Sequence, residues 1–382
     1  LVSRVLDAII DPLVGVTVDH TRTRWGQARP YLLFASIPFA ILCVATFAVP
    51  DWVPAAKVLY AYVTFTLLGI CYSFLYIPYG ALQPMMVREP ALKIRIASWR
   101  AMATSVASIV VYSLVQPLSA LTGPAHRAAG FTLAASVVAT ISVALYLVVF
   151  WRCRERFSAD RTTRPPAAFS EARRLASNPV WQFTFLYGLL SFIRVGVMVS
   201  VAAYFANNVL RRPWVLSVML PLLSVAILIG GVLAGQLLRR YGRRSINTLF
   251  LLASIGCCLL MPYWEDNNFL LIAAFMGSNV VGGIIGTTIF IACTDAVEYH
   301  ESRFGERSEG LVFATVSFGM KVGIAIGAAA TAYTLSWVGY DAHSPNTEAV
   351  HTIRILFYYV PVAMSVLQVA GVLLLDRGRE TS

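Results

Sequence analysis

Residues 128–151, AAGFTLAASVVATISVALYLVVFW, decide the fold class, because these 24 consecutive residues include no charged side chain. A helix needs about 20 such residues to cross the hydrocarbon core of a membrane. We therefore interpret this stretch as a membrane-spanning helix, and the rest of the chain repeats its character.

The composition excludes a water-soluble globular protein. Of the 382 residues, 58% are hydrophobic and 13% are charged, whereas about a quarter of residues are charged in soluble domains. Apolar runs form a group of five and a group of six, at 1–18, 30–50, 57–82, 99–121 and 128–151, then at 181–205, 215–238, 246–263, 269–293, 310–336 and 351–375. The sequence predicts an all-α polytopic membrane protein with about 11 spans.

The polar stretch that follows the first group predicts the domain boundary. It carries seven arginines and the pair Pro165 and Pro166, which is typical of a linker. We expect an N-terminal bundle over 1–151, a linker over 152–180 and a C-terminal bundle over 181–382. The chain has no initiator Met, and similar Arg-containing aromatic-Gly turns at Trp25 and Tyr241 follow the first helix of one group and the second helix of the other. We therefore expect two six-helix bundles whose first helix is missing from this chain, an architecture typical of transporters.

The distribution of basic residues predicts the orientation in the membrane. Of 30 Lys and Arg residues, 21 lie in the loops 19–29, 88–95, 152–174, 239–244 and 294–309 and in the C-terminal tail. Alternate loops enriched in Lys and Arg face the cytoplasm, so we place the linker and the C-terminus there, in a cell membrane that is the inner membrane if the source is bacterial. This bias accounts for the net charge of +11 without nucleic-acid binding.

Enzyme motifs are absent from the sequence. It contains no G-x-S-x-G, no P-loop Gly-Lys-Ser/Thr and no H-E-x-x-H, which are the signatures of hydrolases, nucleotide-binding enzymes and zinc proteases. We expect no enzymatic activity, no cofactor and no metal site, except for a sodium ion at the acids described next.

Two carboxylates in the first apolar run, Asp7 and Asp11, are the strongest candidates for function. Their i,i+4 spacing places both on one face of a helix, where they repel each other unless a cation bridges them or one is protonated. This pattern predicts an Na⁺ or H⁺ site, and the hydroxyl of Ser73 is a candidate additional ligand. The alternative is a structural pair in which Arg4 neutralises one of the two acids.

Besides Arg4, three basic residues lie at or inside spans, where a charge costs about 2.5–3.5 kcal/mol on the insertion scale. Lys321 faces a wet cavity or an acid, or it reaches toward the cytoplasmic end of its span. Arg100 begins a span. Arg194 lies in mid-span, and the sequence leaves structural pairing and substrate contact equally open for it.

A predicted acidic loop at 295–309 breaks the positive-inside pattern and carries Asp295, Glu298, Glu301, Glu306 and Glu309 against Arg303 and Arg307. The basic loops of the other half carry Arg22, Arg24 and Arg29 at 19–29, and Arg88, Lys93 and Arg95 at 88–95. Ion pairs between these loops predict a cytoplasmic gate that breaks when the inside opens. The alternative is a solvated acidic face with pairs worth under about 1 kcal/mol.

At these residues the sequence resembles the glycoside-pentoside-hexuronide:cation symporters, the melibiose-carrier family of the major facilitator superfamily. The resemblance spans essentially the whole chain. Three stretches carry it, namely RVLDAIIDPLVG from Arg4 to Gly15 with the loop up to Pro30, IPYGAL from Ile77 to Leu82 with Trp99 and Arg100, and DAVEY from Asp295 to Tyr299 leading to Lys321.

The resemblance implies roles for several residues. Asp7, Asp11 and Ser73 would bind the coupling cation, and Tyr76, Arg100 and Lys321 would contact substrate. Ile10 stands where sodium-coupled members have a polar ligand, which favours H⁺ over Na⁺. Tyr76 stands where the melibiose carrier has a sugar-binding acid, and Gly80 where it has a tryptophan, which argues against an α-galactoside.

The sequence therefore predicts a monomeric secondary transporter that moves a sugar, glycoside or sugar acid together with H⁺ or Na⁺ by alternating access. Two alternatives remain open. One is the same fold with a non-sugar amphiphile, such as a lysolipid or a drug, as its solute. The other is a transporter-like sensor or a remnant that does not transport.

Overall fold

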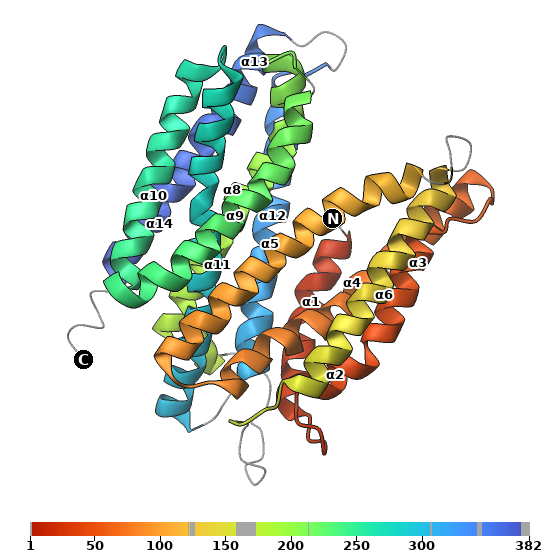
Figure 1. The fold of residues 1–382 in the computed structure, drawn as a ribbon, viewed down its shortest axis with the longest axis vertical. Helices are drawn as coiled ribbons and strands as arrows, with labels where there is room; N and C mark the ends of the chain where they lie inside the picture. The colour runs from red at the N-terminus through yellow and green to blue at the C-terminus, as the bar shows by residue number, and fades with distance from the viewer. Residues whose placement is uncertain are drawn as a thin grey trace. The chain divides into compact units, whose positions relative to one another are not determined.

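The computed structural model describes residues 2–120, 122, 127–157, 173–212, 214–305, 308–341 and 346–375, without the side chains of 2–9, 112, 116, 119, 120, 127, 220, 374 and 375. Across these ranges the regular structure is helical (Figure 1). Ten of the helices are long and apolar enough to cross a membrane. A helix satisfies its own backbone hydrogen bonds in lipid, so apolar runs of this length fold as spans. The prediction of an all-α polytopic membrane protein is confirmed.

The helices coincide with the predicted apolar runs. The first predicted run forms α1, and α2 and α3 together make the next span. In the first part of the chain the bounds are α1 Val2–His20, α2 Arg29–Phe34, α3 Ser36–Phe47, α4 Pro54–Met86, α5 Pro90–Ala120 and α6 Arg127–Arg152.

The second part of the chain contains six further spans. They are α8 Pro179–Tyr204 with the π-helical turn Phe205–Val209, α9 Trp214–Tyr241, α10 Arg243–Leu260 with the 3₁₀ turn Met261–Trp264, α11 Asn268–Phe304, α12 Glu309–Trp337, and α13 Thr347–Arg354 continued through the π-helical turn Ile355–Tyr359 into α14 Val360–Leu375.

Two predicted loops are helical in the structure. Helix α5 begins at Pro90 and therefore includes Lys93, which is almost fully buried. Helix α11 continues to Phe304 and includes most of the predicted acidic loop. In both places charged side chains lower the local hydropathy without interrupting the helix, and proline is well tolerated in a first helical turn because its missing N–H has no partner there anyway.

The described chain groups into two compact units. Unit 1 comprises 1–89, 108–178 and 293–318, and unit 2 comprises 90–107, 179–292 and 319–382. The predicted linker falls mostly on residues 158–172, which lie outside the described residues. The predicted domain boundaries at 151 and 181 therefore stay a prediction.

Unit 1 is built around helices that pack in pairs. Helix α4 packs against α1, α2 and α3, and α6 packs against α2 and α3. In unit 2, α14 packs against α8 and α10. An apolar cluster of unit 2 stacks Phe205 on Phe357, with ring centroids 4.0 Å apart and planes 5° apart.

Candidate functional site

Asp11 and Ser73 lie together inside unit 1. Asp11 is on α1 and Ser73 is on α4, and neither side chain is exposed. The Ser73 hydroxyl donates to Asp11 Oδ1 over 2.6 Å and also approaches the carbonyl oxygen of Gly69 at 3.2 Å. The structure thus brings together two of the three predicted cation-binding residues, although their chain positions differ by 62.

Asp7 precedes Asp11 by one helical turn on α1. Its side chain, like that of Arg4, lies outside the described residues. The choice between a two-carboxylate cation site and an Arg4 pair therefore remains a prediction. Within the described part of the chain, no three His, Cys, Asp or Glu side chains are grouped as they would be around a metal ion.

The predicted substrate residues are distributed over both units. Tyr76 in unit 1 is half-buried and stacks on Tyr72, with ring centroids 5.3 Å apart. In unit 2, the Arg100 guanidinium lies 3.8 Å from the ring centroid of Phe290. Lys321, also in unit 2, is half-buried on α12.

The acidic stretch that was predicted as one side of a gate belongs to unit 1. Asp295, Glu298 and Glu301 lie on α11, and the fully buried Glu309 begins α12. Glu301 accepts two hydrogen bonds from Arg88 NH2, at 3.0 and 3.3 Å. Arg307 and Glu306 lie outside the described residues.

The three arginines that were expected to face the acidic stretch have other partners. Arg22 donates to the carbonyl oxygen of Asp19, Arg24 lies over the Trp25 ring, and Arg29 donates to the carbonyl oxygen of Phe150. Within the described ranges none of the three forms an ion pair with 295–309. Arg88 of the predicted gate forms an ion pair with Glu301 of this stretch, 3.0 Å between NH2 and Oε1.

Asp19 provides a contact that sequence reasoning missed. Its two carboxylate oxygens accept the backbone N–H groups of Gly310 and Leu311, at 2.7 and 2.8 Å. These amides form the first turn of α12, where the helix dipole favours an anion. Gly15 and Gly310 allow the approach, because a Cβ on either residue would meet the backbone of the other.

Glu155, at the start of the predicted linker, was also missed. Its carboxylate accepts the N–H groups of Gln27, Ala28 and Arg29, at 2.8, 2.9 and 3.2 Å. It therefore caps the N-terminus of α2. Gly26 has a φ of 112°, and a Cβ there would collide with this carboxylate. No spacing in the sequence links residues so far apart.

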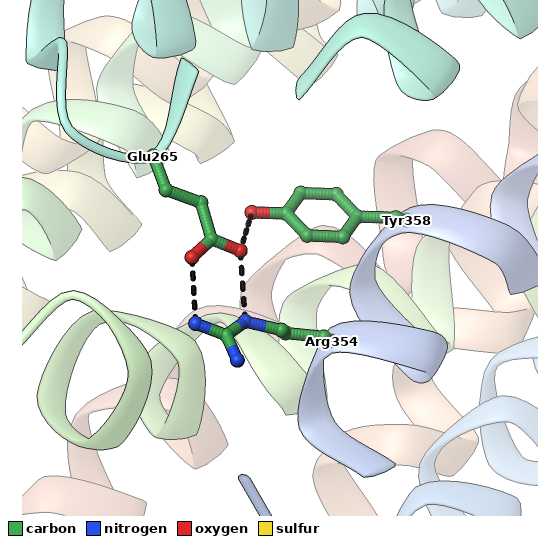
Figure 2. Close-up of polar contacts among 3 residues, drawn as sticks. All are labelled: Glu265, Arg354 and Tyr358. Carbon is green, nitrogen blue, oxygen red and sulfur yellow. Dashed lines mark hydrogen bonds and ion pairs between the residues drawn. The ribbon is translucent and has the colours of Figure 1, made fainter. Parts of the chain in front are cut away.

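Unit 2 contains an ion pair of a different kind, shown in Figure 2. Arg354 donates through Nε and NH2 to the two oxygens of Glu265, at 2.9 and 2.7 Å. The Tyr358 hydroxyl donates to the same carboxylate over 3.0 Å. This two-bond ion pair joins the turn after α10 to the span that contains α13 and α14. Its partners, Glu265 and Arg354, are 89 positions apart, and no sequence pattern predicts their pairing.

The comparisons with known proteins identify the class. The sequence matches the family described as MFS/sugar transport protein over residues 1–376. The chain belongs to this family. It is therefore a multi-pass membrane transporter of the major facilitator superfamily, as predicted.

Curated bacterial transporters align over nearly the whole chain. The inner membrane symporter YicJ of Escherichia coli (strain K12) is 30% identical over 94% of this chain and 79% of its own length. The glucuronide carrier protein homolog of the same strain is 31% identical over 96% and 81%. The isoprimeverose transporter of Lactiplantibacillus pentosus is 29% identical over 95% and 76%.

Solved structures show the same fold at low sequence identity. The proton:xylose symporter XylE aligns with a TM-score of 0.65 and 14% identity, over 95% of this chain and 83% of that one. A bacterial homologue of the iron transporter ferroportin, in its outward-facing state, gives a TM-score of 0.68 and 16% identity, over 99% and 89%. These likenesses confirm the major facilitator fold.

Proposed function

We propose that the protein is a secondary active symporter that moves a sugar, glycoside or sugar acid together with a cation, by alternating access. Membership of the MFS/sugar transport protein family supports a solute of this class. The names of the relatives, a glucuronide carrier homolog and an isoprimeverose transporter, support it further. The proposal includes a monomeric protein, without cofactor or enzymatic activity, whose linker and C-terminus face the cytoplasm.

One observation carries the cation coupling, namely the fully buried Asp11 carboxylate with the Ser73 hydroxyl on it. An ionised carboxylate in a span is costly, and binding a cation or a proton removes that cost. The coupling cycle then follows from linkage, because each ligand raises the affinity of the other by the same factor. The hydroxyl supplies one oxygen ligand of the type that hard cations prefer.

The cation in the proposal is H⁺. The support is Ile10, an apolar residue between Asp7 and Asp11 on α1, at the position where sodium-coupled symporters of the resembled family have a polar ligand. With one fewer oxygen ligand, a proton is easier to accommodate than a sodium ion, because a proton needs only the carboxylate itself.

The experiment is uptake into proteoliposomes that contain the purified protein, with a panel of radiolabelled glycosides, pentosides and uronides. A pH gradient and a sodium gradient of equal magnitude are imposed separately, and protein-free liposomes are the control. We expect one solute of the panel to accumulate above equilibrium, and more strongly with the pH gradient. Equilibration without accumulation under either gradient would refute symport, and strict sodium dependence at constant pH would refute the choice of H⁺.

A further inference from the structure

Arg194 is a buried charge in unit 2 that the proposed coupling site does not use. It lies on α8 and is 3% exposed. Its NH2 group donates to the carbonyl oxygen of Ser278 on α11 over 2.6 Å and to the hydroxyl of Ser254 on α10 over 3.2 Å. Ser254 donates to the same carbonyl over 2.7 Å. One guanidinium thus joins three helices.

No carboxylate neutralises this guanidinium within its own helices. Residues 179–264 and 267–292, which contain α8, α9, α10 and the unit 2 part of α11, include no Asp or Glu. Arginine does not release its proton in proteins, so the charge persists and depends on hydroxyl and carbonyl acceptors. The described partners of Arg194 are acceptors of unit 2, which supports the structural alternative of the two that the sequence left open.

The turn of α11 that Arg194 contacts is also held by α9. A Cβ on Gly283 would collide with the backbone of Ile227 and Gly231, and a Cβ on Gly230 would collide with the carbonyl of Val280. The backbones of α9 and α11 therefore touch within one or two turns of Ser278. Small residues at such crossings allow close helix packing in membranes.

We propose that Arg194 is a positioning residue, which fixes the 278–283 turn of α11 to α8 and α10 while the glycine crossing fixes it to α9. A lysine cannot replace it fully, because its ammonium ends a shorter, more strongly hydrated side chain, whereas the NH2 group of the planar guanidinium reaches both acceptors. The turn serves as the point of unit 2 at which α11 does not move during transport.

Hydrogen–deuterium exchange of the purified protein tests this positioning without any solute. Arg194→Gln removes the charge and shortens the side chain that donates to Ser278 and Ser254, and we expect the amides of 278–286 to exchange about tenfold faster, since a bond to a charged group is lost. Arg194→Lys should give a smaller increase. Thr184→Val is the matched control, because Thr184 is fully buried on the same helix and, among the described residues, its hydroxyl donates to the carbonyl of Val180.

Ser254→Ala is a second variant for the case in which Arg194→Gln does not fold. It keeps the charge of Arg194 and removes one of its two acceptors. We expect faster exchange at 278–286 with peptides of α14 unchanged. Unchanged exchange at 278–286, an equal increase in α14, or wild-type exchange in Arg194→Lys would each overturn the positioning role.

A transport measurement extends the test and rests on the proposed symport. In Arg194→Lys the maximal uptake rate should fall while the KM for the solute stays within about twofold, since the described contacts of Arg194 are all internal to unit 2. A raised KM with an unchanged maximal rate would overturn the inference. If wild-type protein shows no uptake, the proposed function fails while the exchange result still decides the role of Arg194.

Discussion

Asp11 and Arg194 are both buried ionisable residues in spans, but their hydrogen-bond partners differ in kind. Asp11 in unit 1 accepts a hydrogen bond from the Ser73 hydroxyl. Arg194 in unit 2 donates to a backbone carbonyl and to a hydroxyl that itself donates to that carbonyl. A carboxylate loses its charge by binding a proton, whereas a guanidinium does not lose its charge. We infer that the charge of Asp11 changes during transport, whereas the charge of Arg194 stays fixed.

The largest effect should come from reversing the fixed charge. Arg194→Glu places a carboxylate against the carbonyl of Ser278, in helices without a compensating base at that turn, and should cost about 3 kcal/mol or more of stability. Thermal unfolding in detergent measures this. Arg240→Glu is the control, because Arg240 is an exposed residue on α9. An Arg194→Glu protein with a wild-type unfolding temperature would contradict the claim that the acceptors around Arg194 require a fixed positive charge.

A smaller effect should follow from removing the Ser73 hydroxyl that donates to Asp11. Ser73 stabilises the ionised carboxylate of Asp11, the form that must return after the cation is released. Ser73→Ala should therefore reduce gradient-driven solute accumulation about tenfold, while equilibrium exchange of the solute across the membrane changes little. Ser73→Thr should retain most of the accumulation. Thr64→Val is the control, since Thr64 is buried on the same helix and bonds within it. Equal accumulation in Ser73→Ala and wild type would remove Ser73 from the site.

The smallest effect should come from an ion pair that is not buried. The side chains of Arg88 and Glu301 are 47% and 32% exposed, so the pair is worth under about 1 kcal/mol. Arg88→Glu or Glu301→Arg should slow uptake no more than about fivefold, and the double reversal should restore the rate. Labelling of an introduced cysteine from the cytoplasmic side should increase in the single reversals. Unchanged labelling would show that this pair is a solvated contact and no part of a gate.

The apolar runs were predictable because each span must be apolar over its whole length, and this constraint is local. The pairing of Asp11 with Ser73 was also within reach, since buried polar residues in lipid need partners. The contacts of Asp19 and Glu155 were not, because their partners are backbone N–H groups, which every residue has and which leave no mark in a sequence. Arg22, Arg24 and Arg29 contact backbone carbonyls or aromatic rings in this structure, and their ion pairs with the acidic stretch stay a prediction.

The most direct test of the account is uptake by Asp11→Asn in proteoliposomes, measured as accumulation under a pH gradient and as equilibrium exchange without a gradient. Asparagine keeps the size of the side chain and its acceptor for Ser73 but cannot change charge. We predict that Asp11→Asn loses solute accumulation under the pH gradient but keeps equilibrium exchange of the solute and thermal stability. Accumulation at the wild-type level in Asp11→Asn would contradict the assignment of the coupling charge to Asp11.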